Sequence, residues 1–72
     1  MTLNELKLNE TGYINDLRCN DGVKRRLLDL GLIKGTKITP IFVSPSGDPT
    51  AFELRGTVIA IRVEDTRLIE LK

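Results

Sequence analysis

The sequence contains no histidine and no tryptophan, a single cysteine, Cys19, and only three aromatic residues. Zinc-finger spacing and histidine-based catalysis need side chains that are missing here, and one cysteine cannot form a disulfide within the chain. We therefore expect no enzymatic activity, and the free thiol fits a reducing, cytosolic setting. Cys19 itself is expected to be a small, half-buried filler beside the core.

Long apolar stretches are also missing. The longest uninterrupted apolar runs, residues 41–43 and 58–61, are far shorter than the ~20 residues that a helix needs to cross a bilayer. Residues 1–10 lack the cationic start and the apolar centre of a signal peptide. These absences predict a chain with no export signal and no membrane insertion.

The length and the charge set further limits. At 72 residues the chain fits one small domain, which must bury nearly all its apolar side chains and has no room for a deep substrate cavity. The net charge is only +1, although residues 18–37 hold six Lys or Arg against two Asp. Because phosphate binding usually shows in the charge sum, no nucleic-acid partner is expected.

One proper helix is predicted over residues 21–30. Asn20 is a good N-cap, and Asp21 suits the positive end of the helix dipole. Apolar residues recur at the spacing of one helical face, namely Val23, Leu27 and Leu30. This stripe is expected to pack on the core.

The end of this helix is equally well defined. Gly31 can adopt the left-handed conformation that closes a Schellman motif, and Leu32 is then expected to fold back onto Leu27. At the start of the chain, Thr2 and Glu5 have the spacing of a capping box, which predicts a single helical turn.

The rest of the sequence predicts strands. Residues 11–17 fit a first strand, and β-branched residues dominate after Gly35. Four further strands are expected over residues 37–43, 51–54, 57–63 and 68–71. Pro40 cannot donate to a strand ladder, so it should lie at an edge or a bulge. Residues 57–63 are apolar on both alternating faces, which predicts a central strand covered on both sides.

These elements predict a mainly β fold. Five short strands, with one short α-helix between the first and the second, are expected to close one partly open small β-barrel. Residues 44–50 are too long and too rich in proline for a tight hairpin turn. They predict an exposed, stiffened loop that contains Pro45, Gly47, Asp48 and Pro49.

The three consecutive cations at the start of the helix, Lys24, Arg25 and Arg26, break a local rule. The helix dipole disfavours positive charge at that end, so the cluster favours a functional role. On a helical wheel Arg25 points away from the core. The plainer interpretation is that Arg25 pairs with Asp29 on the surface and that the other cations serve solubility.

Leu28 lies off the apolar stripe and beside these cations. An apolar side chain rimmed by Arg and Lys is typical of a small docking surface, although a neighbouring strand could also cover it. Carboxylates occur at positions 48, 53, 64 and 65, but they lack the spacing of a metal site. We expect solvated turns there, with no metal and no cofactor.

Several segments in a fixed order resemble the FeoA family from end to end. The most specific is Arg25-Arg26-Leu27-Leu28-Asp29-Leu30-Gly31-Leu32 with Gly35, followed by Pro45-x-Gly47-Asp48-Pro49. Leu3 and Leu6, Gly12 with Ile14, Ile61-Arg62 and residues 68–71 complete the pattern. The resemblance implies an SH3-like five-stranded barrel in the bacterial cytoplasm that assists FeoB, a membrane transporter of ferrous iron with a cytosolic GTPase domain, so that the protein lies at most at the periphery of the inner membrane.

Two functions from different classes follow. The first is an accessory or regulatory protein of ferrous-iron uptake that binds FeoB through a docking face. The residues of this hypothetical docking face are Lys24, Arg25, Arg26, Leu28, Pro45, Gly47, Asp48 and Pro49. The second is an RNA- or ribosome-associated small barrel that uses the basic helix. A peptide-binding SH3 domain of eukaryotic type is disfavoured, because its aromatic shelf needs more aromatic residues than this chain has.

Overall fold

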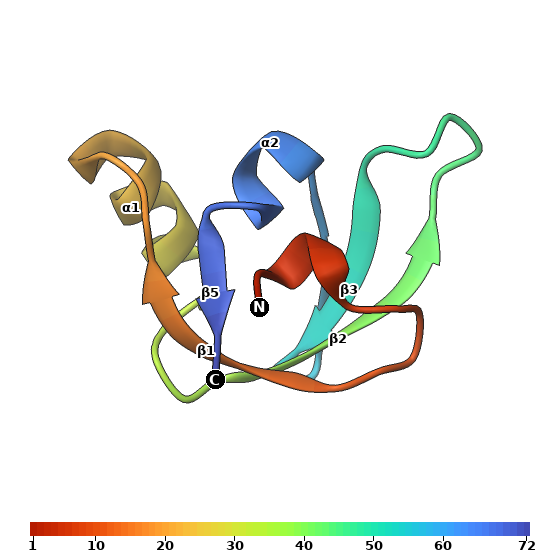
Figure 1. Ribbon diagram of the computed structural model, residues 1–72, viewed down its shortest axis with the longest axis horizontal. Coiled ribbons are helices and arrows are strands. Elements are labelled where there is room, and N and C mark those ends of the chain that lie inside the picture. The colour runs from red at the N-terminus through yellow and green to blue at the C-terminus, as the bar shows by residue number, and fades with distance from the viewer.

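The computed structural model describes residues 1–72. Five strands wrap around one core, with the helix α1 on one side and the short helix α2 across the top of the view (Figure 1). The elements follow in the order η1 (Leu3–Glu5), β1 (Gly12–Leu17), α1 (Asp21–Asp29), β2 (Lys37–Val43), β3 (Thr50–Leu54), β4 (Thr57–Ile61), α2 (Val63–Thr66) and β5 (Ile69–Leu71).

All five strands form one antiparallel sheet in the order β4-β3-β2-β1-β5. The sheet is not closed into a barrel, because β4 and β5 stand at its two edges and do not pair. It bends where its registers shift, between Pro40 and Phe42 in β2 and between Ile14 and Asp16 in β1. Of the two places expected for Pro40, an edge or a bulge, the structure has the bulge, because β2 is the central strand.

The core lies inside the bent sheet and contains no charged side chain. It draws on every element except α2: the buried members are Leu3, Ile14, Leu17, Leu27, Leu32, Ile38, Phe52, Leu54, Ile61, Ile69 and Leu71. Cys19 is half-buried and packs against this cluster, as a space-filling thiol should. The single turn at the start of the chain places Leu3 in the core, and the capping box between Thr2 and Glu5 is formed.

Helix α1 has the predicted cap at each end, and it ends at Asp29, one residue before the predicted end. The Asn20 side chain accepts the N–H of Val23 at 3.0 Å. At the other end Gly31 has φ 99°, and the N–H of Leu32 bonds to the Leu27 carbonyl at 3.1 Å. This is the long hydrogen bond of a Schellman motif. Leu27 and Leu32 are both buried in the core.

The prediction that Leu30 ends the apolar stripe of α1 and packs on the core is wrong. Leu30 is the C-cap of α1, and it is 43% exposed. The helix ends there and the chain reverses through Gly31, so Leu30 has no wall to face. The stripe that reaches the core consists of Val23 and Leu27.

The interpretation of residues 57–63 as a central, doubly covered strand is also wrong. β4 is an edge strand that ends at Ile61, and Val58 and Ala60 on its outer face are exposed. The alternating apolar pattern is real, but only Ile61 of this strand is fully buried. Val63 starts α2, a short helix that the strand pattern concealed.

Candidate functional site

The three cations of α1 are all exposed, but their surroundings differ. The Nη2 atom of Arg26 lies 2.7 Å from Oδ2 of Asp65, on α2. Lys24 and Arg25 take part in none of the three ion pairs of the structure. The expected surface pair between Arg25 and Asp29 is not formed. The expectation that these cations crowd the disfavoured end of the helix is wrong: Arg26 lies in the last turn of the nine-residue α1, where the dipole favours a cation, and Lys24 and Arg25 lie in its middle. Lys24 and Arg25 are left without an internal anion.

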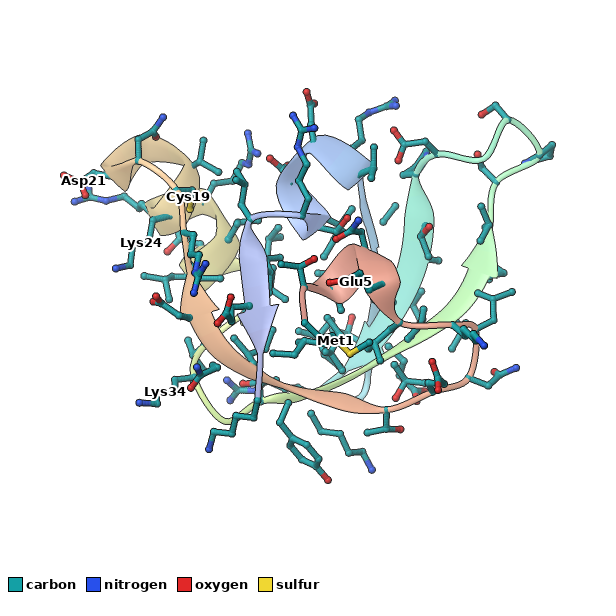
Figure 2. All side chains as sticks on the ribbon, in the orientation of Figure 1. Met1, Glu5, Cys19, Asp21, Lys24 and Lys34 are labelled. Carbon is teal, nitrogen blue, oxygen red and sulfur yellow. The ribbon has the colours of Figure 1, made fainter.

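Leu28 is 40% exposed, and no strand covers it. It borders an open hollow of about 190 Å³ between α1 and β1. Its charged lining consists of Lys24, Lys34 and one anion, Asp16, and its floor includes Ile14 and Leu32. Figure 2 shows both lysines on the same side of the molecule, at the left of the view. An exposed leucine beside two free cations makes this a candidate contact site for an acidic and apolar partner surface.

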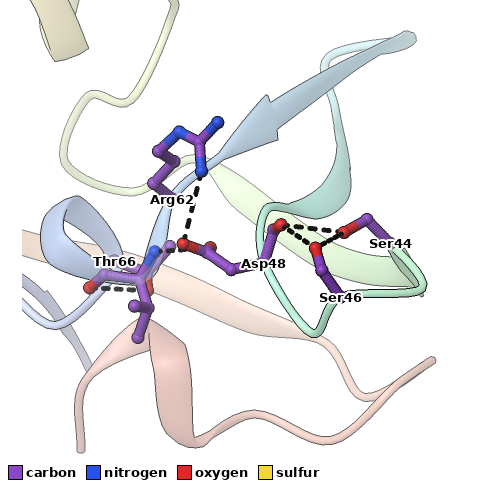
Figure 3. A network of polar contacts seen from close by, with 6 residues as sticks. Ser44, Ser46, Asp48, Arg62 and Thr66 are labelled. Carbon is purple, nitrogen blue, oxygen red and sulfur yellow. Dashed lines mark hydrogen bonds and ion pairs between the residues drawn. The ribbon is translucent and has the colours of Figure 1, made fainter.

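The loop between β2 and β3 is held in shape by its own serines. The hydroxyls of Ser44 and Ser46 donate to the Asp48 carbonyl at 2.8 and 2.9 Å (Figure 3). The N–H of Gly47 donates to the Ser44 carbonyl at 2.8 Å. Pro45 and Gly47 are exposed at the tip, whereas Asp48 and Pro49 are half-buried. The tip of the loop is exposed, as predicted, and the hydrogen bonds of its serines hold its shape.

The Asp48 side chain has a structural task that the sequence did not show. Its Oδ1 atom accepts the N–H of Val63 at 2.9 Å, which is the first N–H of α2 (Figure 3). Its Oδ2 atom lies 3.7 Å from Nη1 of Arg62. This carboxylate lies outside the helix in sequence, yet it satisfies a free N–H at the start of α2. Its negative charge also interacts favourably with the positive end of the helix dipole.

Helix α2 therefore connects the two halves of the predicted docking face. Asp65 pairs with Arg26 of α1 on one side, and Val63 donates its N–H to Asp48 of the loop on the other. In Figure 1 α2 lies between α1 and the loop, and all three gather at the top of the view. The predicted residues do not form one compact cluster: Lys24 and Leu28 border the hollow beside β1, and Arg26 points to α2.

Sequence reasoning missed three residues of this surface, Lys34, Arg62 and Asp65. Lys34 belongs to the basic stretch of residues 18–37, but it lies outside α1, so helical spacing does not relate it to Lys24. Arg62 and Asp65 act across separations of 14 and 39 residues, through contacts with Asp48 and Arg26. Local patterns carry no signal for such long-range pairs.

The two larger hollows of the surface lie elsewhere. One of about 710 Å³ runs between residues 33–39 and the hairpin turn at Arg55-Gly56, and its lining is mostly polar. The other, of about 420 Å³, lies between η1, the β2–β3 loop and α2, and Gly47 contributes to its wall. No group of three or more His, Cys, Asp or Glu side chains is placed to hold a metal ion. No helix is long and apolar enough to cross a membrane.

The sequence model of the FeoA domain matches residues 1–72, the whole described chain. The chain belongs to the FeoA domain family. Its SH3-like fold follows from the same comparisons: a crystal structure of Stenotrophomonas maltophilia FeoA complexed with zinc, described as a prokaryotic SH3 domain protein, has 30% sequence identity and a TM-score of 0.82. That match covers 100% of this chain and 89% of the other.

Matches to two further relatives extend over nearly the whole of this chain. The solution structure of FeoA from Chlorobium tepidum has 31% identity and a TM-score of 0.90, over 99% of this chain and 68% of that one. A Campylobacter jejuni protein named "Putative Fe(2+) transport protein A" is 32% identical over 71 residues, which are 99% of this chain and 96% of the relative. The resemblance read from the sequence is thus confirmed at the level of the family and the fold.

Proposed function

We propose that this FeoA-domain protein is a cytosolic accessory protein of ferrous-iron uptake that acts by binding the cytosolic face of the transporter FeoB. Membership of the family and the name of the C. jejuni relative support the link to iron transport. The absence of a catalytic grouping in the sequence favours action by binding, with no chemistry of its own. The observation that carries the proposal is the exposed Leu28 beside the unpaired Lys24 and Lys34.

Two regions of this chain would form the docking face for FeoB. The first is the hollow beside α1, with Lys24 and Leu28, together with the exposed Arg25. The second is the fixed loop tip, with Pro45 and Gly47. The contacts of α2 with Arg26 and Asp48 hold both regions in a defined relation, so that a partner meets a preformed surface and little ordering cost arises on binding.

The test is a binding titration with the isolated cytosolic domain of FeoB from the same genome, at two salt concentrations. Arg25→Glu reverses a charge on the face, and Pro45→Asp adds one at the loop tip. Lys72→Glu is the matched control, because this exposed cation lies at the opposite, lower end of the molecule in Figure 1. Thermal melts of all variants check that each is folded.

We expect Arg25→Glu to weaken binding about ten-fold, mainly through slower association, and Lys72→Glu to leave it unchanged. Equal affinities for the wild type and both face variants would contradict the docking face. A parallel titration against generic RNA separates the alternative class: a steep fall of affinity with salt would indicate phosphate contacts. The net charge of only +1 predicts no such binding.

A further inference from the structure

β4 is an open edge of the sheet, and it is unusual in having no visible protection. Its sequence, Thr-Val-Ile-Ala-Ile, has no charged residue and no proline, and its pairing with β3 runs without a bulge. Natural proteins commonly protect such edges with charges, prolines, bulges or a covering segment. An edge that lacks these devices is a candidate site for pairing with a further strand.

The opposite edge shows the contrast. β5 is only three residues long and carries Glu70. The start of the chain covers it, because Thr2 bridges to Glu70 and the Leu71 N–H donates to the Met1 carbonyl at 2.8 Å. The chain therefore closes one edge of its sheet and leaves the other open.

The hairpin between β3 and β4 determines which backbone groups of β4 face outward. Arg55 and Gly56 both have positive φ, 52° and 78°, as in a type I′ turn, so Leu54 and Thr57 form the first hydrogen-bonded pair. Because such pairs alternate along an antiparallel ladder, Ile59 also bonds to Phe52.

Val58 and Ala60 then direct their N–H and carbonyl groups away from the sheet. No backbone hydrogen bond outside the sheet ladder, and no side-chain hydrogen bond, involves residues 57–61. Both residues are exposed, so these four backbone groups are open to a partner. They form two donor–acceptor pairs with the spacing of a strand.

The charges at the two ends of β4 indicate what kind of strand fits. Arg55 precedes β4 and Arg62 follows it, and both are exposed. Only Arg62 has an internal anion nearby, at 3.7 Å. A neutral edge with a cation at each end is complementary to an extended segment with an apolar centre and an acidic residue at each end.

A second copy of this chain fits the same edge poorly. Antiparallel pairing of two β4 strands about Ile59 sets Arg62 of one copy opposite Gly56 of the other. Arg62 then lies beside Arg55 of the other copy, and the two-fold symmetry repeats the repulsion at both ends. The charges thus favour a different chain over self-pairing.

We propose that β4 is a strand-addition site, which binds an extended, acidic-ended segment of a partner protein through the backbone of Val58 and Ala60. Such pairing takes its affinity from main-chain hydrogen bonds. The site is separate from Leu28 and the loop tip, and it does not depend on the partner's being FeoB.

The test uses a synthetic seven-residue peptide, capped at both ends, with alternating Val and Thr between two terminal Glu residues. Amide NMR spectra of the full chain are recorded during titration with this peptide. We expect the largest shifts at Val58 and Ala60, and slower hydrogen exchange at both amides, because their N–H groups gain acceptors. Shifts centred on Leu28 or spread without focus would overturn the proposal.

Two control peptides separate strand pairing from charge attraction. N-methylation at the third and fifth residues removes the two N–H groups that meet Val58 and Ala60, and keeps every side chain. We expect roughly ten-fold weaker binding from the two lost hydrogen bonds. Equal binding of the methylated peptide would contradict strand addition. A peptide with Lys at both ends should bind more weakly than the acidic one, and equal binding would contradict the assigned charge preference.

Variants of the chain complete the test. Arg55→Asn removes one end charge with a residue that tolerates positive φ, and it should weaken the acidic peptide about two- to five-fold. Lys72→Gln is the matched control, because this exposed cation follows β5 at the opposite edge of the sheet, and it should have no effect. If Val58 and Ala60 respond to rising protein concentration without peptide, the edge belongs to a second copy, and the proposal of a different partner is wrong.

Discussion

Asp48 accepts the backbone N–H of Val63 at 2.9 Å, which fixes the β2–β3 loop to the first turn of α2. The helix that donates this hydrogen bond also holds Arg26 of α1 through Asp65. One carboxylate on a loop thereby helps to set the relation between the two regions that we assign to partner binding.

Removing this cap should destabilise the protein measurably. Asp48→Ala deletes the acceptor of the Val63 N–H, and losses of this type cost about 1 kcal/mol. Asp48→Asn keeps an oxygen acceptor but loses the charge near Arg62, an exposed pair at 3.7 Å, and should cost less than about 0.5 kcal/mol. Chemical denaturation measures both. A larger loss for Asp48→Asn than for Asp48→Ala would contradict the capping role.

Leu27 and Leu28 should respond very differently to truncation. Leu27 is 1% exposed and is anchored at the end of α1, so Leu27→Ala is expected to cost about 2 to 4 kcal/mol through the lost contacts and the cavity. Leu28 is 40% exposed, and Leu28→Ala should cost less than about 1 kcal/mol. Urea denaturation of the two variants compares them. Equal losses would show that Leu28 belongs to the core.

Acid should weaken the first turn of the chain through Glu5. Hydrogen bonds from the N–H and the hydroxyl of Thr2 lower the pKa of this carboxyl below its ordinary value of 4.5. The folded state therefore prefers the charged form. This contribution is complete above the pH where Glu titrates in the unfolded chain, and it is lost as the pH falls through the lower, folded value.

Glu5→Gln should accordingly flatten the acid side of the stability profile. The measurement is the free energy of unfolding from neutral pH down to acid pH for the wild type and the variant. Glu53→Gln serves as control, because Glu53 is exposed and has no ion pair or side-chain hydrogen bond. Identical acid profiles for the wild type and Glu5→Gln would refute the assigned role of Thr2.

The protein should fold without any metal. The core is complete from side chains alone, and no grouping of ligands is placed to bind an ion. We expect EDTA to leave the melting temperature unchanged, and added Fe(II) to leave it unchanged as well. A drop of several degrees on chelation that Fe(II) restores would reveal a site that this structure does not contain.

Local physics explains which features the sequence could predict. The cap at Asn20, the reversal at Gly31 and the bulge at Pro40 each depend on one residue type with one conformational preference. All three are found in the structure. The β2 strand also has the predicted bounds, residues 37–43, because its β-branched residues favour extended backbone.

The features that the sequence could not predict depend on distant contacts. Helix α2 has four residues and no apolar periodicity, and Asp48, which lies 15 residues away, provides its cap. The apolar pattern of residues 57–61 correctly predicts a strand, but the place of that strand in the sheet depends on the topology of the whole chain. The sequence pattern alone therefore cannot distinguish an edge strand with an exposed apolar face from a central strand with a covered one. For the docking residues, the basic cluster gave a signal. The ion pair of Arg26 with Asp65 and the shared position of Lys24 and Lys34 at one hollow gave none.

The central claim is that this chain binds FeoB through the face formed by α1 and the loop tip. Amide NMR spectra of the labelled chain, recorded with increasing amounts of the FeoB cytosolic domain, test it most directly. The account predicts shifts and broadening concentrated at Lys24, Arg25, Leu28 and Lys34 and at the loop tip, with the spectrum near Lys72 unchanged. Undisturbed signals at these positions, with the FeoB domain bound elsewhere on the chain or not at all, would contradict it.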